Sequence, residues 1–228
     1  MTGILYTISV WLIPAITAIT LHEAAHGWVA LKLGDDTAQR MGRVTFNPIS
    51  HIDPFGTILL PGMLLLAGAP FLFGYAKPVP VNFARLRQPK RDMIWVAMAG
   101  PGINIAMAFA AALLFHLVPL LPAGGGQEWV IRNLQNAFLL NIILAVFNML
   151  PLPPLDGSRV VAGLLPTAQA REYLKLERYG LFILIALLAL PPLIGGQLGI
   201  DLNILRWILL PPVDFVSDIL IRAAGLSG

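Results

Sequence analysis

Cysteine is absent from the 228-residue sequence, and charged residues are scarce, at 12% of the chain. The lack of cysteine excludes disulfide bonds, thiolate metal ligands and cysteine nucleophiles. An ordinary soluble domain carries about a quarter charged residues, whereas 57% of this chain is hydrophobic. The net charge of +3 comes from Lys and Arg beside apolar segments, which is typical of membrane topology signals and argues against nucleic acid as a partner. The sequence therefore predicts an integral membrane protein surrounded by the lipid bilayer.

Long apolar runs dominate the rest of the composition. A membrane-spanning helix needs about 20 apolar residues, and four stretches qualify, namely residues 4–31, 93–117, 137–155 and 179–198. Two further apolar stretches, 55–75 and 204–221, are interrupted by proline. We expect an all-α polytopic membrane protein with about four to six transmembrane helices, folded as a single membrane-embedded domain over residues 1–228.

The region between the first two regular spans has the least regular pattern. Residues 42–50, G-R-V-T-F-N-P-I-S, alternate weakly and contain a β-branched pair, which favours a short strand or hairpin. The stretch 55–75 contains proline and glycine, and irregular backbone survives at membrane depth only where protein or trapped water satisfies its hydrogen bonds. We therefore predict a re-entrant, partly β segment in this region.

The C-terminal region is open to several interpretations. Residues 164–178 predict an amphipathic helical connection on the cytosolic side, more typical of a solvated linker than of a partner site. Residues 204–221 fit a final span, an interfacial helix or an oligomer contact, and Pro211 and Pro212 argue against a straight helix there.

The stretch L-H-E-A-A-H-G at 21–27 places ionisable side chains in an apolar span, since residues 1–31 contain no Lys, Arg or Asp. In H-E-x-x-H on a helix, both imidazoles lie on one face, one turn apart, where they can ligate zinc. Glu23 then lies beside the metal and can take a proton from a water that zinc has acidified. The alternative is a buried cluster of His22, Glu23 and His26 that stabilises helix packing. Ionisable groups at membrane depth are expensive and usually functional, so hydrolysis chemistry is favoured.

A catalytic zinc takes three protein ligands and leaves the fourth position to water or substrate. The leading candidate for the third ligand is Asp156 in N-M-L-P-L-P-P-L-D-G, residues 148–157, where three prolines prevent regular helix. Taken alone, Asp156 fits a turn residue, because Asp-Gly is a common turn dipeptide. His51 and Asp53 in H-I-D-P compete with it as ligands. His116 is expected to be a core or interfacial histidine.

The distribution of basic residues gives an independent test of Asp156. If 55–75 crossed the membrane completely, Asp156 would lie at the opposite face from His22 and His26, and the basic residues would divide 9 to 4. If the stretch dips in and returns, the three residues share one face and the division is 12 to 1, with Arg132 alone opposite. The positive-inside rule favours the second arrangement. It predicts an amino terminus outside and a metal site a short way in from the cytosol.

These motifs resemble those of the site-2 protease family of zinc intramembrane proteases. The resemblance rests on H-E-A-A-H-G, A-G-P-G-I-N at 99–104 and N-M-L-P-L-P-P-L-D-G, in that order, and it covers most of residues 5–165. H-I-D-P-F-G-T-I-L-L-P and G-Y-A-K-P-V-P-V-N are similar to the compact bacterial branch, which lacks PDZ and CBS domains. The resemblance implies a metalloprotease core over 5–165 and a multi-pass protein of the bacterial plasma membrane, and the apolar stretches predict C-terminal helices within 178–222.

Site residues follow from the resemblance by position. It implies one zinc ion per chain with three protein ligands and a general base, namely His22, His26, Asp156 and Glu23. It makes Asn148 a candidate for positioning the substrate or donating to the developing oxyanion. Asn104 would pack the metal-bearing helices or hold the substrate, and His51 would support the substrate or the structure.

The leading interpretation is a zinc endopeptidase that cleaves transmembrane segments of other proteins in regulated intramembrane proteolysis. Because a helical peptide bond has its carbonyl and amide engaged, the substrate must unwind, and an edge strand within residues 42–80 could hold it by β-augmentation. The alternative for that segment is a kinked packing helix.

The alternative function is a metal transporter or a non-catalytic metal-binding protein, which is disfavoured because Glu23 is placed as a base and the sequence predicts no polar path across the bilayer. An inactive scaffold is a third, weaker interpretation.

Overall fold

The computed structural model describes residues 3–66, 74–200 and 202–226, and within these ranges all regular structure is helical. The prediction of an all-α protein is therefore confirmed. The helices, in chain order, are α1 (Ile4–Lys32), α2 (Thr37–Arg40), η1 (Pro48–His51), η2 (Pro54–Leu59), α3 (Leu60–Leu66), η3 (Phe83–Arg85), α4 (Pro89–Leu114), η4 (Phe115–Leu120), α5 (Gly125–Asn148), α6 (Asp156–Leu164), α7 (Thr167–Leu174), α8 (Glu177–Leu198) and α9 (Ile204–Ala223).

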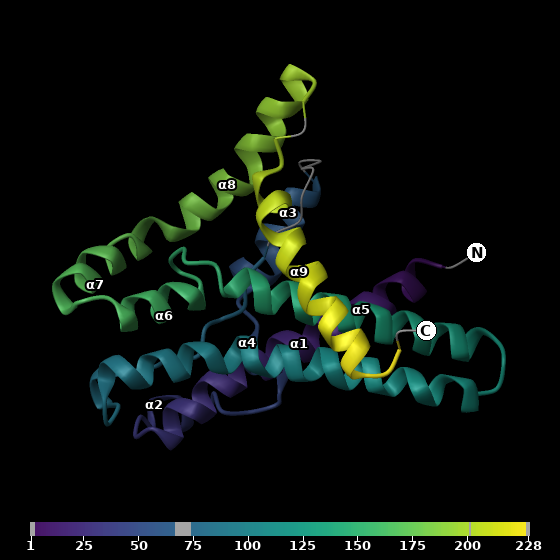
Figure 1. Ribbon diagram of the computed structural model, residues 1–228, viewed down its shortest axis with the longest axis horizontal. Coiled ribbons are helices and arrows are strands. Elements are labelled where there is room, and N and C mark those ends of the chain that lie inside the picture. The colour runs from purple at the N-terminus through teal and green to yellow at the C-terminus, as the bar shows by residue number, and fades with distance from the viewer. Residues whose placement is uncertain (1–2, 67–73, 201, 227–228) are drawn as a thin grey trace.

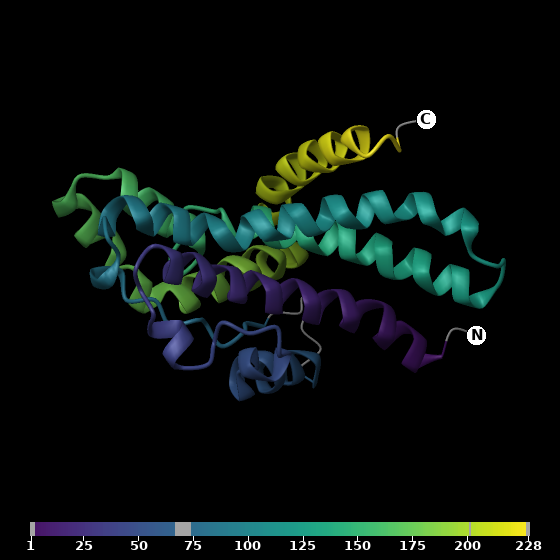
Figure 2. The same ribbon diagram turned by 90° about the horizontal axis from the view of Figure 1, so that it is seen from below.

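Helices α1, α4 and α5 form a bundle in which α4 runs antiparallel to the other two (Figures 1 and 2). Ala18, Ala108 and Ala112 are buried in this bundle, and such small side chains let membrane helices approach closely. We call the end where α1 finishes, α4 begins and α5 finishes the Lys32 end, and the opposite end, where α5 begins, the Gly125 end. Helix α9 lies across the bundle, where Val213 and Leu220 pack against α4 and α5.

Within the described residues, four helices are long and apolar enough to cross a membrane, namely Leu5–Lys32, Pro89–Leu120, Gly125–Asn148 and Glu177–Leu198. Three of them agree closely with the predicted spans. The third differs because α5 begins at Gly125 rather than near residue 137, and it ends at Asn148, before the prolines. The early turns of α5 are polar, but they are accommodated by hydrogen bonds to α1, such as that from Trp129 Nε1 to Ser9 Oγ at 2.9 Å.

The connection between α1 and α4 begins and finishes at the Lys32 end. The Arg87 N–H donates to the Leu33 carbonyl at 3.0 Å, which joins the two ends of the connection. Within it, the Tyr75 N–H donates to the Gly56 carbonyl at 3.0 Å, and η1, η2 and α3 lie alongside α1 (Figure 2). These contacts bring Gly56 and Tyr75 together, and residues 67–73 of the stretch predicted to be re-entrant lie outside the described residues.

The predicted strand at 42–50 is wrong, since these residues form turns and the 3-10 helix η1. Gly42 has a φ of 66°, which turns the chain, and the Asn47 side chain accepts from the Ile49 N–H to start η1. In place of strand pairing, the buried Arg43 guanidinium donates to the Lys77 carbonyl at 2.6 Å. The region is therefore held by side-chain contacts to main-chain carbonyls, which alternation of residue types does not reveal.

Candidate metal centre

Three predicted ligands meet at the Lys32 end of the bundle. His22 and His26 lie one turn apart on α1, with their Nε2 atoms 3.1 Å from each other. Asp156, the first residue of α6, places Oδ2 at 3.2 Å from His22 Nε2 and 3.3 Å from His26 Nε2. The prolines after α5 turn the chain so that α6 begins beside α1. These three side chains form the one group of potential metal ligands found among the described residues.

The hydrogen bonds behind the two rings leave their Nε2 atoms available. His26 Nδ1 lies 2.7 Å from the Val96 carbonyl, which can only accept, so Nδ1 carries the proton and Nε2 keeps a lone pair. His22 Nδ1 lies 2.6 Å from Asn104 Oδ1, which has the same consequence. Fixing a ring tautomer through the other nitrogen is the usual arrangement behind metal-binding histidines.

The three facing atoms fit a zinc ion. Asp156 Oδ2 is buried without a hydrogen-bond partner, and the lone pairs of two histidines cannot supply one. Tetrahedral zinc with bonds of about 2.0–2.1 Å separates its ligand atoms by about 3.3 Å, close to the spacings of 3.1–3.3 Å found here. A cation between these atoms would relieve the repulsion among three electron-rich groups.

Glycines in two of the predicted motifs permit the close approach of α4 and α6. A Cβ atom on Gly100 would lie 2.4 Å from His26 Nε2 and 2.5 Å from His22 Cε1. A Cβ atom on Gly157 would lie 2.2 Å from the Met149 carbonyl oxygen. Both distances are far shorter than van der Waals contact, so neither position has room for a side chain.

Glu23 and Asn148 line the same cavity as the three candidate ligands, which has a volume of about 360 Å³. Glu23 Oε2 accepts from the Val79 N–H at 2.8 Å, so the non-helical segment 76–82 lies against this carboxylate. One amide hydrogen of Asn148 is donated to the Leu144 carbonyl at 2.9 Å, which leaves a second hydrogen for another acceptor. Arg159 and Glu177, an ion pair between α6 and α8, also line the cavity.

Comparison with known proteins places this arrangement in a family. The sequence profile of Peptidase family M50 matches residues 125–191, which include Asn148 and Asp156. The Bacillus subtilis (strain 168) protein named "Putative zinc metalloprotease YwhC" is 40% identical over 185 residues, which are 78% of this chain and 80% of that protein. The chain belongs to peptidase family M50, the site-2 protease family. As an M50 member it is a membrane zinc metalloprotease, and the resemblance noted in its motifs is confirmed.

Further M50 relatives are more distant. The Rip2 proteins of Mycolicibacterium smegmatis (strain ATCC 700084 / mc(2)155) and Mycobacterium tuberculosis (strain ATCC 25618 / H37Rv) share the description given to YwhC. The first is 27% identical over 78% of this chain and 66% of its own length, and the second is 28% identical over 81% of this chain and 68% of its own length. No solved structure matches the chain.

The structure places the competing ligand candidates away from the centre of this M50 protein. His51 is buried, with Nε2 3.0 Å from the Thr45 carbonyl. Asp53 Oδ1 accepts from the backbone of Phe55 and Gly56 and so caps η2. His116, in η4, is exposed rather than in the core, and its Nε2 lies 2.7 Å from the Ala224 carbonyl at the end of α9. His51 and Asp53 therefore stabilise the α1–α4 connection.

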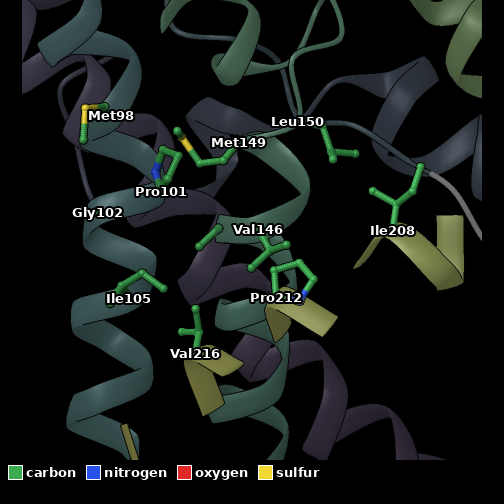
Figure 3. A pocket seen from close by; sticks show the side chains of 11 residues that line it. Met98, Pro101, Gly102, Ile105, Val146, Met149, Leu150, Ile208, Pro212 and Val216 are labelled. Carbon is green, nitrogen blue, oxygen red and sulfur yellow. The ribbon is translucent and has the colours of Figure 1, made fainter. Parts of the chain in front are cut away.

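A larger cavity of about 540 Å³ lies between α4, α5 and α9 (Figure 3). Its lining contains no titratable side chain, so it carries none of the chemistry predicted from the motifs. The side chains come from three helices and include Met98, Pro101, Ile105, Val146, Met149, Ile208, Pro212 and Val216.

Sequence reasoning missed two contributions to the site. The Val79 N–H holds Glu23, but a backbone donor has no residue-type signal. Asn141, which lies behind Asn104, is fully buried within α5. The sequence alone could have indicated that Asn141 is important, since it is a lone amide in the apolar run L-L-N-I-I-L.

Proposed function

We propose that this metalloprotease is an intramembrane endopeptidase that hydrolyses peptide bonds within or near transmembrane segments of other proteins. The observation that carries the proposal is the convergence of His22, His26 and Asp156, with Glu23 beside them, among helices apolar enough to cross a membrane. We further propose that these three residues bind one zinc ion per chain.

The residues around the centre have distinct roles in this proposal. When bound, zinc would lower the pKa of a water molecule and polarise the scissile carbonyl. The Glu23 carboxylate takes the proton from the attacking water and delivers it to the leaving amine. The free amide hydrogen of Asn148 donates to the oxygen on which negative charge develops. Asp156, His22 and His26 keep fixed positions because each is held by packing or by a hydrogen bond from behind.

The substrate is proposed to lie extended along the segment 76–82. Pro78 and Pro80 lack N–H groups and restrict their own φ angles, which keeps this segment from becoming helix. Val79, between them, contacts Glu23 and so places the segment beside the reacting groups. An unwound substrate can pair here with main-chain groups that are not already bonded to Glu23, Arg43, His51 or Asp35, as in other cases of strand addition. In this proposal the α1–α4 connection is re-entrant, and its residues 42–80 also screen the centre from lipid.

We propose that the Lys32 end faces the cytosol of a bacterial cell, within the plasma membrane, and that the amino terminus lies outside. Helix α2, the start of α4, α6 and α7 all lie at the Lys32 end (Figure 1), and these elements and their connections contain most of the basic residues. The positive-inside rule assigns such an end to the cytosol.

Replacing Glu23 with Gln tests the function. Detergent-purified wild type and Glu23→Gln are compared for cleavage of a panel of tagged transmembrane substrates, and zinc per chain is measured on both. We expect zinc in both proteins and cleavage by wild type alone. The matched control is Glu128→Gln, an exposed carboxylate in the first turn of α5, which should cleave like wild type.

Other outcomes separate the alternatives. Zinc in both proteins with metal transport that survives Glu23→Gln would support the transporter. Cleavage that persists in Glu23→Gln would remove this residue as the base. Absence of zinc from both proteins would overturn the metal site and return the three side chains to a packing role.

A further inference from the structure

Two fully buried asparagines connect His22 to the interior of α5. Asn104 Oδ1 lies 2.6 Å from His22 Nδ1, and Asn104 Nδ2 donates to Asn141 Oδ1 at 2.7 Å. Asn141 Nδ2 donates in turn to the Ala137 carbonyl of its own helix at 2.8 Å. Both asparagines have no exposed surface. A buried amide is expensive unless it is hydrogen-bonded, and here each amide is bonded on both its oxygen and its nitrogen.

The direction of this chain of hydrogen bonds is fixed at Ala137. A backbone carbonyl only accepts, so the Asn141 nitrogen must face Ala137 and the Asn141 oxygen must face Asn104. Asn104 then has to present its nitrogen to Asn141 and its oxygen to His22, and the Ala18 carbonyl, 3.4 Å from Asn104 Nδ2, favours the same orientation. Reversing the Asn104 amide would place two oxygens against each other. His22 must therefore donate from Nδ1, which leaves the Nε2 lone pair facing Asp156.

We propose that Asn141 is a positioning residue of the metal centre, which holds Asn104 and through it the ring and tautomer of His22. This inference rests on the zinc site proposed above. The two histidines differ in this respect, because His26 is oriented directly by the Val96 carbonyl. The orientation of His22 depends on side chains alone, so substituting those side chains can change it.

Asn136 provides a matched control on the same helix. Its Nδ2 donates to the Val10 carbonyl of α1 at 2.8 Å, so a partly buried amide joins α5 to α1 here, as Asn141 joins α5 to α4. Asn136 makes no hydrogen bond to the residues of the metal centre among those described. Replacing Asn136 removes helix packing of the same kind without touching the route to His22.

The test measures metal binding rather than activity. Full-length wild type, Asn141→Leu and Asn136→Leu are purified in detergent, and zinc affinity is determined by competition with a chelator. Partners behind metal ligands typically contribute about 10- to 100-fold to affinity, so we expect Asn141→Leu to bind zinc about 10-fold more weakly. The cobalt-substituted Asn141→Leu protein should also show a changed visible absorption spectrum. Asn136→Leu should retain both wild-type affinity and the wild-type spectrum.

Two further proteins separate positioning from general destabilisation. In an Asn104→Leu background, Asn141→Leu should have little additional effect on zinc affinity, because the route to His22 is already broken. Asn141→Asp keeps an oxygen that accepts from Asn104 in either protonation state, so it should restore most of the affinity and remains informative if Asn141→Leu does not fold.

The possible results discriminate clearly. The positioning role would be overturned by wild-type zinc affinity in Asn141→Leu or by an equal loss in Asn136→Leu. It would also be overturned if Asn141→Leu caused its full loss of affinity in the Asn104→Leu background, or if Asn141→Asp lost as much affinity as Asn141→Leu. If wild type binds no zinc, or if His22→Ala binds it as tightly as wild type, the proposed metal site itself fails.

Discussion

The two ends of the α1–α4–α5 bundle both contain polar side chains in apolar helices, but these side chains are satisfied differently. At the Gly125 end, Trp129 donates to Ser9 and Asn136 donates to the Val10 carbonyl, so each of these donors meets an acceptor on α1. At the Lys32 end, the two histidine Nε2 atoms and Asp156 Oδ2 face one another as three acceptors. Polar residues within a membrane span therefore do not by themselves indicate a functional site. A functional site is indicated by converging polar groups that cannot satisfy one another's hydrogen bonds.

The largest effect is expected from displacing the converging groups His22, His26 and Asp156. In Gly100→Ala, the new methyl group would overlap both imidazoles, so we expect zinc affinity to fall by about 10- to 100-fold and cleavage to be lost. Gly102→Ala is the matched control, since nothing lies within 4 Å of a Cβ atom there. Zinc content and cleavage are measured on both proteins. Zinc binding by Gly100→Ala equal to that of Gly102→Ala would contradict the close approach of α4 to the histidines.

A second prediction concerns Asp35, which stabilises the Lys32 end without belonging to the metal centre. This buried carboxylate accepts from the backbone N–H groups of Thr37 and Asn82 at 3.0 and 2.6 Å. Asp35→Ala should lower the free energy of unfolding by about 1–3 kcal/mol. Asp36→Ala, which removes partly exposed ion pairs with Arg40 and Arg85, should cost less than about 1 kcal/mol. Thermal unfolding in detergent measures both changes.

The same carboxylate gives a pH dependence. Burial raises the pKa of Asp35, but the hydrogen bonds from Thr37 and Asn82 outweigh it and lower this pKa below its usual value. The contribution of Asp35 to stability is therefore complete above the ordinary pKa of about 4 and is lost as the pH falls below it. The difference in unfolding temperature between wild type and Asp35→Ala should shrink under acidic conditions. A difference that grows on acidification would show that the ionised form is not the one that stabilises the fold.

A small effect is expected at the Gly125 end. Trp129→Phe removes the donor to Ser9 and should lower the free energy of unfolding by about 1 kcal/mol. Zinc affinity should be unchanged, because the substitution lies far along α5 from Asn141 and Asn148. Zinc loss in this variant would show that the two ends are coupled, which would contradict the difference between them described above.

The convergence of the three candidate ligands is more predictable from sequence than the connection that covers them. The i, i+4 spacing of His22 and His26 fixes their geometry on any helix, and the need for a third ligand selected Asp156. Charge counting predicts that the two histidines and Asp156 lie at one end of the bundle. Each inference depends on local helix geometry or on the chemistry of a metal, which the sequence carries directly.

The remainder depends on contacts that residue patterns do not specify. Residues 42–50 alternate like a strand, yet they lack a pairing partner among the described residues and are held by Arg43 on the Lys77 carbonyl. The polar beginning of α5 resembles a loop, but Trp129 and Asn136 satisfy it by bonding to α1. The role of Asn141 can be inferred only from its contact with Asn104. In each case a distant partner decides the role of the residue.

Zinc content of three detergent-purified proteins, wild type, Asp156→Ala and Asp53→Ala, tests the central claim most directly. Asp53 is the matched control because it competes with Asp156 on sequence grounds but caps η2 in the structure. The predicted result is about one zinc per chain in wild type and Asp53→Ala, and far less in Asp156→Ala, as a site with three protein ligands requires. Zinc retained in Asp156→Ala, or lost in Asp53→Ala instead, would contradict the metal centre described here.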